Sequence, residues 1–211
     1  MNTDFIKSLT KEDFKHTVNL HIHTNSSDGT YSADEILEQA YELGLEHIAI
    51  TDHNTLDAYK NSGLLASPIV TTGIEFDCWF GYVFFHLLGY GIDVNSEDLK
   101  PFLAKSHADK TSDIRRLFST RNVEHLIQAI HKSGGIAVLA HPACYWCINL
   151  DSFVKSLIKI GLDGIEVYYP YDRMRGVVKF HSRHTVEKIA DKYNLIKTGG
   201  TDCHKKLSTL E

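Results

Sequence analysis

The sequence lacks most features that mark secreted, membrane or nucleic-acid-coating proteins. Its 211 residues include only four cysteines, which form no recognisable disulfide framework for a chain of this size. No apolar run approaches the roughly 18 residues that a membrane span requires. The amino terminus has neither the basic nor the apolar region of a signal peptide. These absences predict a reduced, cytoplasmic protein without a membrane partner.

Basic charge is also scarce, whereas histidine is abundant. The chain has 22 lysines and arginines against 27 aspartates and glutamates, so its net charge is −5. A surface that coats duplex nucleic acid is normally basic, so this class of partner is not expected. A small anionic substrate stays compatible with the charge, because bound metal ions reverse the local sign. The 13 histidines favour metal or proton chemistry.

Apolar segments alternate between strand-like and helix-like patterns along the chain. The predicted strands are Val18–His21, Ile48–Thr51, Ile69–Glu75, Ile136–Ala140, Gly164–Tyr168 and Leu195–Thr198. The predicted helices are Ala33–Leu43, Val123–Lys132, Leu150–Ile160 and Val177–Tyr193. Ser32 and Glu35 have the spacing of a capping box at the first of these helices. Repeated strand–helix units predict a single α/β domain with a largely parallel sheet.

One stretch breaks this alternation. Residues 75–90 have the pattern of a β-hairpin that turns near Gly81. Residues 96–121 are polar and are predicted to be helical. Three arginines near the end of that segment are each expected on its solvated surface, although any of them could contact a phosphate group: Arg115, Arg116 and Arg121.

Candidate metal ligands follow the predicted strands. His21 and His23 are two residues apart at the end of the first strand, so strand geometry would point both to one face. Asp202 and His204 repeat this spacing after the last strand. The other candidates, from the segments between them, are Asp28, His53, Glu75, His86 and His141. Imidazoles and carboxylates gathered at several strand ends are what a multinuclear metal site requires.

Some of these residues have a structural alternative. Asp28 could be an ordinary turn aspartate, and His86 could be a buried core histidine in an apolar strand. Asp52 and His53 are neighbours in an extended segment and should face opposite ways, so only His53 is expected in the site. Asp77, two residues after the candidate glutamate, could share the face of that glutamate, but solvation on the hairpin is the expected role.

Other side chains are expected outside the cluster. His181 and His184 are predicted to be solvated on a helix, and Cys203 should point away from its two neighbouring ligands. Three tyrosines after the sixth predicted strand could either line a pocket or pack in the core: Tyr168, Tyr169 and Tyr171.

Taken in order, these motifs resemble the PHP family, named for polymerase and histidinol phosphatase domains. The resemblance covers nearly the whole chain and rests on Asn19-Leu20-His21-Ile22-His23-Thr24, Ile50-Thr51-Asp52-His53, His86-Leu87-Leu88-Gly89-Tyr90, Ala140-His141-Pro142 and Gly200-Thr201-Asp202-Cys203-His204. It is strongest to the stand-alone phosphoesterases. The resemblance implies a distorted (β/α)7 TIM-like barrel whose metal site lies at the carboxyl ends of the strands.

The resemblance also implies three divalent ions, of zinc, manganese or iron. The first would be held by His21, His23, Glu75 and Asp202, the second by Glu75, His86 and His141, and the third by Asp28, His53 and His204. Glu75, which would bridge two ions, is assigned a catalytic role together with Asp202 and His204. Many family members carry a larger helical subdomain where this single 1–211 domain has only its insertion at about 96–121.

The expected reaction is hydrolysis of a phosphate ester by a bridging water that two metal ions activate to hydroxide. No serine or cysteine has a suitable partner, so water is the expected nucleophile. The expected substrate is a small phosphorylated molecule, such as a nucleotide or a short oligonucleotide. Three alternatives stay open: histidinol-phosphate phosphatase, amidohydrolase and a non-catalytic metal-binding regulatory module. The sequence does not determine the oligomeric state.

Overall fold

Seven strands form one sheet in the order β1-β2-β3-β4-β5-β6-β7. The computed structural model describes residues 3–60, 62–174 and 180–210. The strands are β1 (Val18–Ile22), β2 (His47–Ile50), β3 (Val70–Phe80), β4 (Val83–Tyr90), β5 (Ile136–Leu139), β6 (Gly164–Tyr168) and β7 (Ile196–Gly199). The predicted α/β class is confirmed.

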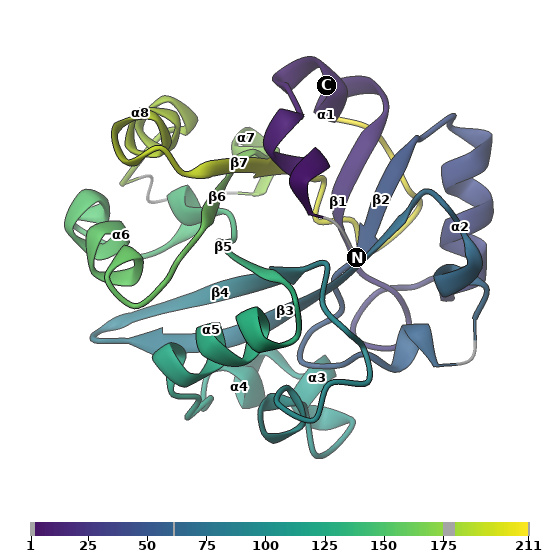
Figure 1. Ribbon diagram of the computed structural model, residues 1–211, viewed down its shortest axis with the longest axis horizontal. Helices are drawn as coiled ribbons and strands as arrows, with labels where there is room; N and C mark the ends of the chain where they lie inside the picture. Colours follow the sequence, from purple (N-terminus) through teal and green to yellow (C-terminus); the bar gives the residue numbers. More distant parts are fainter. Residues whose placement is uncertain (1–2, 61, 175–179, 211) are drawn as a thin grey trace.

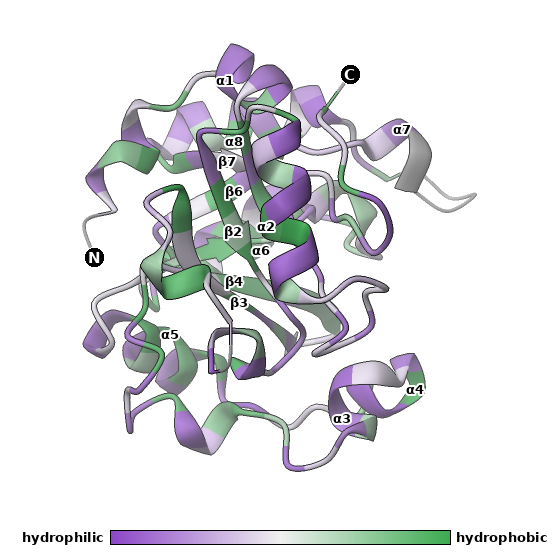
Figure 2. Cartoon of the chain, turned by 90° about the vertical axis from the view of Figure 1, so that its right-hand side faces the viewer, coloured by the Kyte–Doolittle hydropathy of each residue, from purple (hydrophilic) through white to green (hydrophobic). Residues whose placement is uncertain are grey.

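Helices lie around the outside of these strands (Figure 1). They are α1 (Lys11–His16), α2 (Ala33–Glu42), α3 (Ala108–Thr111), α4 (Asp113–Arg116), α5 (Val123–Lys132), α6 (Leu150–Ile158), α7 (Tyr171–Met174) and α8 (Arg183–Tyr193). Shorter 3-10 helices are η1 (Asp4–Ser8), η2 (Asp57–Tyr59), η3 (Leu64–Ala66), η4 (Lys100–Phe102) and η5 (Pro142–Cys144). Figure 2 shows hydrophobic residues concentrated in the strands and hydrophilic ones on the outer helix surfaces, the pattern of a buried sheet. None of the helices in the described ranges has the length and hydropathy of a membrane span.

Strand β4 distorts the otherwise parallel sheet. It pairs antiparallel with β3 on one side and with β5 on the other, whereas all other neighbouring strands are parallel. The β3–β4 pair is the predicted hairpin, which turns at Gly81 with a φ of +61°. Only glycine adopts this angle readily, because it has no Cβ.

The two edges of the sheet meet at its carboxyl end. The backbone N–H of His23 donates to the carbonyl of Cys203 at 2.9 Å, and the Cys203 N–H donates to the carbonyl of His21 at 3.4 Å. The Cys203 thiol lies 3.0 Å from the Lys205 carbonyl, so it points away from its neighbours, as predicted. These contacts bring the loop after β7 beside the end of β1.

Local signals locate α2 and α8, but α8 is shorter than predicted. Ser32 and Glu35 form the predicted capping box, in which the Ser32 N–H donates to Glu35 Oε2 at 2.7 Å. The helix predicted from residue 177 begins instead at Arg183, because Ser182 is extended and its hydroxyl accepts the Thr185 N–H at 3.2 Å. Residues 177–179 lie outside the described residues. His181 therefore precedes the helix, and its Nε2 lies 2.6 Å from the Cys147 carbonyl.

The helical prediction for residues 96–121 is largely wrong. The segment contains only η4, α3 and α4, and the two α-helices have four residues each. Ser112 is extended and caps α4, since its hydroxyl accepts the Arg115 N–H, so α3 and α4 cannot join. Figure 1 shows α3 and α4 below β3 and β4. The Trp79 indole N–H donates to the Leu117 carbonyl at 2.7 Å, so the end of α4 lies against β3.

Candidate metal centre

The nine side chains singled out as ligands come together at the carboxyl end of the sheet. Eight of them form three overlapping groups: His21, His23, Glu75 and Asp202; His53, Glu75 and His86; and His23, Asp28, His53 and His204. Within each group the ligand atoms lie within 4.8 Å of one another. His141 joins them, with Nε2 lying 3.2 Å from Glu75 Oε1 and 3.3 Å from His86 Nδ1. Their role as metal ligands stays a prediction.

Glu75 lies at the middle of this cluster. Its Oε2 lies 3.2–3.4 Å from Nε2 of His21, His23 and His53, and its Oε1 lies 3.0–3.2 Å from Nδ1 of His86 and Nε2 of His141. Burial raises the pKa of Glu75, but the surrounding imidazolium charges outweigh it and hold that pKa well below its ordinary value. An ionised carboxylate whose two oxygens face different sets of imidazoles is suited to bridging two cations.

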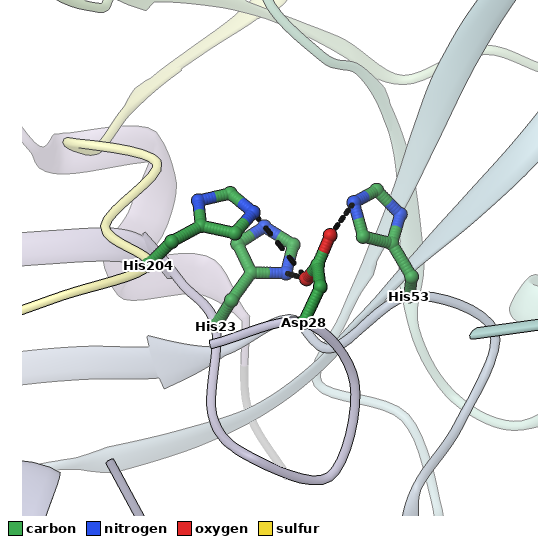
Figure 3. Close-up of side chains that lie close together, drawn as sticks. All are labelled: His23, Asp28, His53 and His204. Carbon is green, nitrogen blue, oxygen red and sulfur yellow. Dashed lines mark ion pairs between the residues drawn. The ribbon is translucent and has the colours of Figure 1, made fainter. Parts of the chain in front are cut away.

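Asp28 lies among three imidazole rings (Figure 3). Its Oδ1 lies 3.6 Å from His23 Nδ1 and 3.3 Å from His204 Nε2, and its Oδ2 lies 3.7 Å from His53 Nε2. The following Gly29 allows this tight turn, because a Cβ there would lie 2.4 Å from the His23 carbonyl oxygen. Asp28 is thus both a turn residue and part of the cluster.

Asp202 and His204 converge for a different reason than the one predicted. Strand β7 ends at Gly199, and Asp202 has a left-handed φ of +52°, so strand alternation does not align the two side chains. The turn directs Asp202 Oδ1 to 3.1 Å from His23 Nε2. Such angles are uncommon for residues other than glycine and concentrate at functional sites.

Two further buried carboxylates lie behind the histidines. Glu166 accepts the His141 N–H at 2.8 Å, and its other oxygen lies 3.0 Å from His21 Nδ1. Asp77 Oδ1 lies 3.4 Å from His53 Nδ1 and 3.3 Å from His86 Nε2. Both side chains are 0% exposed.

Glu166 is not among the residues predicted for the site, and Asp77 is more buried than predicted. The expectation that Asp77 is solvated is wrong, because the β3–β4 register places it opposite His86 and strand alternation places it on the face of Glu75. One signal in the sequence could have identified Glu166, which is a carboxylate inside the apolar strand Gly164–Tyr168. Burying an unpaired carboxylate is costly, so a carboxylate at such a position indicates a charged partner. Asp52 points away, as predicted, and accepts hydrogen bonds from Thr24 and Ser27.

Buried polar atoms without a hydrogen-bond partner indicate that the cluster fits divalent metal ions. Among the described residues, six such atoms belong to it, namely His21 Nε2, both ring nitrogens of His23, His53 Nδ1, Glu75 Oε2 and His141 Nδ1, and a seventh is Asp77 Oδ1 behind it. Leaving a buried polar atom unsatisfied costs about 1–3 kcal/mol. Mixed imidazole and carboxylate donors suit zinc, manganese or iron, so ligation would satisfy these atoms.

The part of the chain that carries most of this cluster matches a known protein family. The model of the PHP domain matches residues 19–195. This chain belongs to the PHP family. A phosphoribosyl 1,2-cyclic phosphate 1,2-diphosphodiesterase from Eggerthella lenta is 25% identical over 263 residues, covering 90% of this PHP chain and 95% of the relative. That alignment is longer than this chain, so the relative has residues in the matched region without a counterpart here.

Two other proteins are similar to this chain. A 3′,5′-nucleoside bisphosphate phosphatase from Chromobacterium violaceum is 26% identical over 143 residues, covering 66% of this chain and 46% of that protein. The crystal structure of a protein assigned as a metal-dependent phosphoesterase from Bifidobacterium adolescentis aligns with a TM-score of 0.68 at 22% identity, covering 90% of this chain and 88% of that one. The structural likeness shows a shared fold.

In this PHP domain, two of the three arginines before α5 face inward. Arg116 is 9% exposed, and its Nη1 donates to Asp28 Oδ2 at 2.8 Å. Arg121 donates to the carbonyls of Phe102 at 2.8 Å and Asp77 at 3.1 Å. Of the three, only Arg115 is solvated, so the prediction that Arg116 and Arg121 lie on a solvated surface is wrong. The insertion folds back over the cluster, and this long-range contact is not encoded in a local pattern.

Metal uptake by this site is expected to release protons. Burial lowers the pKa of His23, but hydrogen bonds and charges from Asp202 and Glu75 outweigh it and raise the pKa to about 10. His23 is therefore protonated at neutral pH and must lose a proton before it binds metal. Burial lowers the pKa of His53 to about 4, so that ring is already neutral. Metal affinity should consequently rise with pH, by about tenfold per pH unit for each proton released.

Titration calorimetry with zinc at pH 7, in buffers of different ionisation enthalpy, measures the protons released. A His125→Asn variant, altered at an exposed site outside the cluster, should release the same number as the wild type. Metal binding without proton release would contradict the raised pKa of His23.

Proposed function

We propose that this PHP domain is a metal-dependent phosphoesterase that hydrolyses a small phosphate ester. The observation that carries the proposal is the cluster of eight imidazole and carboxylate side chains around the buried, ionised Glu75. The two similar curated proteins are named as a diphosphodiesterase and a phosphatase, which supports the same reaction class. A nucleotide or a related sugar phosphate is the substrate class that fits these names best.

We assign the nine side chains to three divalent ions, of zinc, manganese or iron. His21, His23 and Asp202 would hold one, His86 and His141 a second, and Asp28, His53 and His204 a third, with Glu75 shared by the first two. Bound ions of this kind polarise a phosphoryl oxygen and lower the pKa of a coordinated water. The distances from Glu75 to both sets of imidazoles support the shared role.

Three residues supply further parts of the reaction. Arg116 lies at the cluster, where its Nη1 donates to Asp28 Oδ2 and its Nη2 donates to Asp113 Oδ1, so it places a positive charge close to a phosphate held there. Asp202 is held by the Tyr169 hydroxyl, which donates to its Oδ2 at 2.8 Å. His204 has the most exposed side chain of the six clustered histidines, at 32%, so it is the proposed ligand that an incoming substrate reaches most easily.

Elemental analysis of the purified protein, followed by a phosphate-release screen, tests this proposal. The screen includes nucleoside monophosphates, nucleoside bisphosphates, short oligonucleotides and histidinol phosphate. Turnover of at least one ester class is expected, with loss on chelation by EDTA and recovery on addition of zinc, manganese or ferrous iron. A fully metal-loaded protein that releases no phosphate would overturn the proposal and favour a non-catalytic module.

A further inference from the structure

One carboxylate oxygen of Asp77 lies between two proposed metal ligands that belong to different ions. Asp77 Oδ1 lies 3.4 Å from His53 Nδ1 and 3.3 Å from His86 Nε2. The other nitrogen of each ring faces Glu75, where His53 Nε2 lies 3.4 Å from Oε2 and His86 Nδ1 lies 3.0 Å from Oε1. His86 belongs to the proposed second ion and His53 to the third, so a single buried oxygen faces ligands of both sites.

The charge of Asp77 determines which ring nitrogens carry protons. Arg116 Nε lies 3.9 Å from Asp77 Oδ1, and a nearby cation favours the ionised form of a carboxylate. An ionised carboxylate only accepts hydrogen bonds. Among the described residues, Asp77 Oδ1 and His53 Nδ1 are both buried without a hydrogen-bond partner, so each can satisfy the other. Protons on His53 Nδ1 and His86 Nε2 leave the two nitrogens that face Glu75 free to bind metal.

The side chain of Asn54 holds Asp77 in this orientation. Asn54 is buried, and its Nδ2 donates to Asp77 Oδ2, while its Oδ1 accepts the Asp77 N–H at 3.2 Å. Asn54 has a left-handed φ of +57°, an angle that asparagine adopts more readily than most residues do. Both oxygens of Asp77 therefore face donors, which are the Asn54 amide on one side and the two imidazoles on the other.

The insertion also contacts this pair of residues. The Ala104 N–H donates to the Asn54 carbonyl at 2.8 Å, and Asn54 Nδ2 donates to the Asp109 carbonyl at 3.1 Å. The Ser119 hydroxyl donates to the Asp77 carbonyl at 2.6 Å. The sheet and the insertion thus hold Asn54 and Asp77 from two sides, which restricts the orientation of both side chains.

We propose that Asp77, oriented by Asn54, is a positioning residue that sets which nitrogen of His53 and of His86 binds metal. The inference rests on the three-ion assignment in the proposed function and deepens it, because it names the residues that align the second and third sites. Asp77 acts on these sites through the two imidazoles. Within the described part of the chain, no hydrogen bond or ion pair joins Asp77 to the histidines of the first site, so that site should not depend on it.

Nitrogen-15 NMR of the zinc-loaded protein tests the positions of the ring protons. Zinc has a filled d shell and no redox chemistry, so it suits this measurement. We expect His53 to keep its proton on Nδ1 and His86 to keep its proton on Nε2. A proton on His53 Nε2, a proton on His86 Nδ1 or a failure to bind zinc would overturn the proposal.

Replacing Asp77 with asparagine tests the consequence for metal binding. An asparagine amide places its NH₂ group against either the Asn54 amide or the two imidazoles, so one set of contacts is lost. We expect the second and third ions to bind about tenfold to a hundredfold more weakly, while the first ion is retained. Elemental analysis after competition with a chelator measures this difference. Asp98→Asn, an exposed change outside the cluster, is the control. Equal loss of all three ions, or loss of none, would show that Asp77 is not a positioning residue.

A glycine at position 54 separates the role of the side chain from that of the backbone. Asn54→Gly keeps the left-handed φ, because glycine adopts this angle readily, but it removes the amide that orients Asp77. The same selective loss of the second and third ions is expected. Asn194→Gly is the matched control, because Asn194 is exposed at the end of α8 with a φ of +52°, and its metal binding should equal that of the wild type. Wild-type metal binding by Asn54→Gly would overturn the role of the Asn54 side chain.

None of these measurements depends on turnover. If the ring protons and the selective metal losses are found but no phosphate ester is hydrolysed, only the proposed function fails. If an ester is hydrolysed while the ring protons or the metal losses differ from these expectations, only the positioning role fails.

Discussion

Replacing Glu75 with glutamine is expected to reduce phosphate release by about 10³-fold or more, the scale for loss of a preorganised electrostatic group. Glutamine keeps the shape of the side chain but removes the negative charge that faces five imidazoles. Two ions that share this carboxylate should both bind more weakly. Elemental analysis should therefore show a joint loss of two ions in Glu75→Gln.

A surface control separates this effect from a general charge change. Glu38 is exposed on α2, away from the cluster, so Glu38→Gln should retain wild-type turnover and metal content. Circular dichroism of both variants establishes that each is folded. Full turnover by Glu75→Gln at unchanged metal content would rule out the bridging role.

Replacing Glu166 with glutamine is expected to lower metal affinity and turnover by about tenfold to a hundredfold. The Glu166 carboxylate accepts hydrogen bonds only, so it keeps a proton on His21 Nδ1 and leaves Nε2 to face Glu75 and Asp202. Its other oxygen accepts the His141 N–H. Glutamine places an NH₂ group against one of these two donors, so one of these two contacts is lost.

Metal competition against a chromophoric chelator measures this loss directly. The His21 Nδ1–H resonance in proton NMR gives a readout specific for positioning, and it should shift or broaden in Glu166→Gln. Glu42→Gln, an exposed change on α2, serves as the control. Unchanged metal affinity together with an unchanged His21 resonance would show that Glu166 is not a positioning residue.

Local patterns in the sequence predict much of the architecture. The helix Val123–Lys132 and the strand Gly164–Tyr168 have the predicted bounds, because hydrophobic periodicity reports directly on which face of a segment is buried. The cap at Ser32 and the hairpin turn at Gly81 follow from backbone preferences of single residues. Each of these signals involves residues close together in the chain.

The errors arise where distant segments interact. Arg116 lies in a polar segment that has the pattern of a solvated helix, yet Ser112 breaks that helix and Arg116 reaches Asp28. The local sequence predicts that Asp77 is a solvated hairpin residue, but the β3–β4 register places it opposite His86. A polar residue at such a position is equally compatible with solvent or with a buried charged partner, and only its tertiary neighbours distinguish the two.

The sequence by itself determined the strand–helix alternation and the donor set of imidazoles and carboxylates, because side-chain chemistry and periodicity are local properties. The tertiary structure decided which donors share a centre. The antiparallel β3–β4 register, the left-handed turn at Asp202 and the meeting of β1 with the loop after β7 set those distances. The enclosure of Glu75 by imidazoles follows from these contacts, since burial and charge pairing depend on which segments pack together.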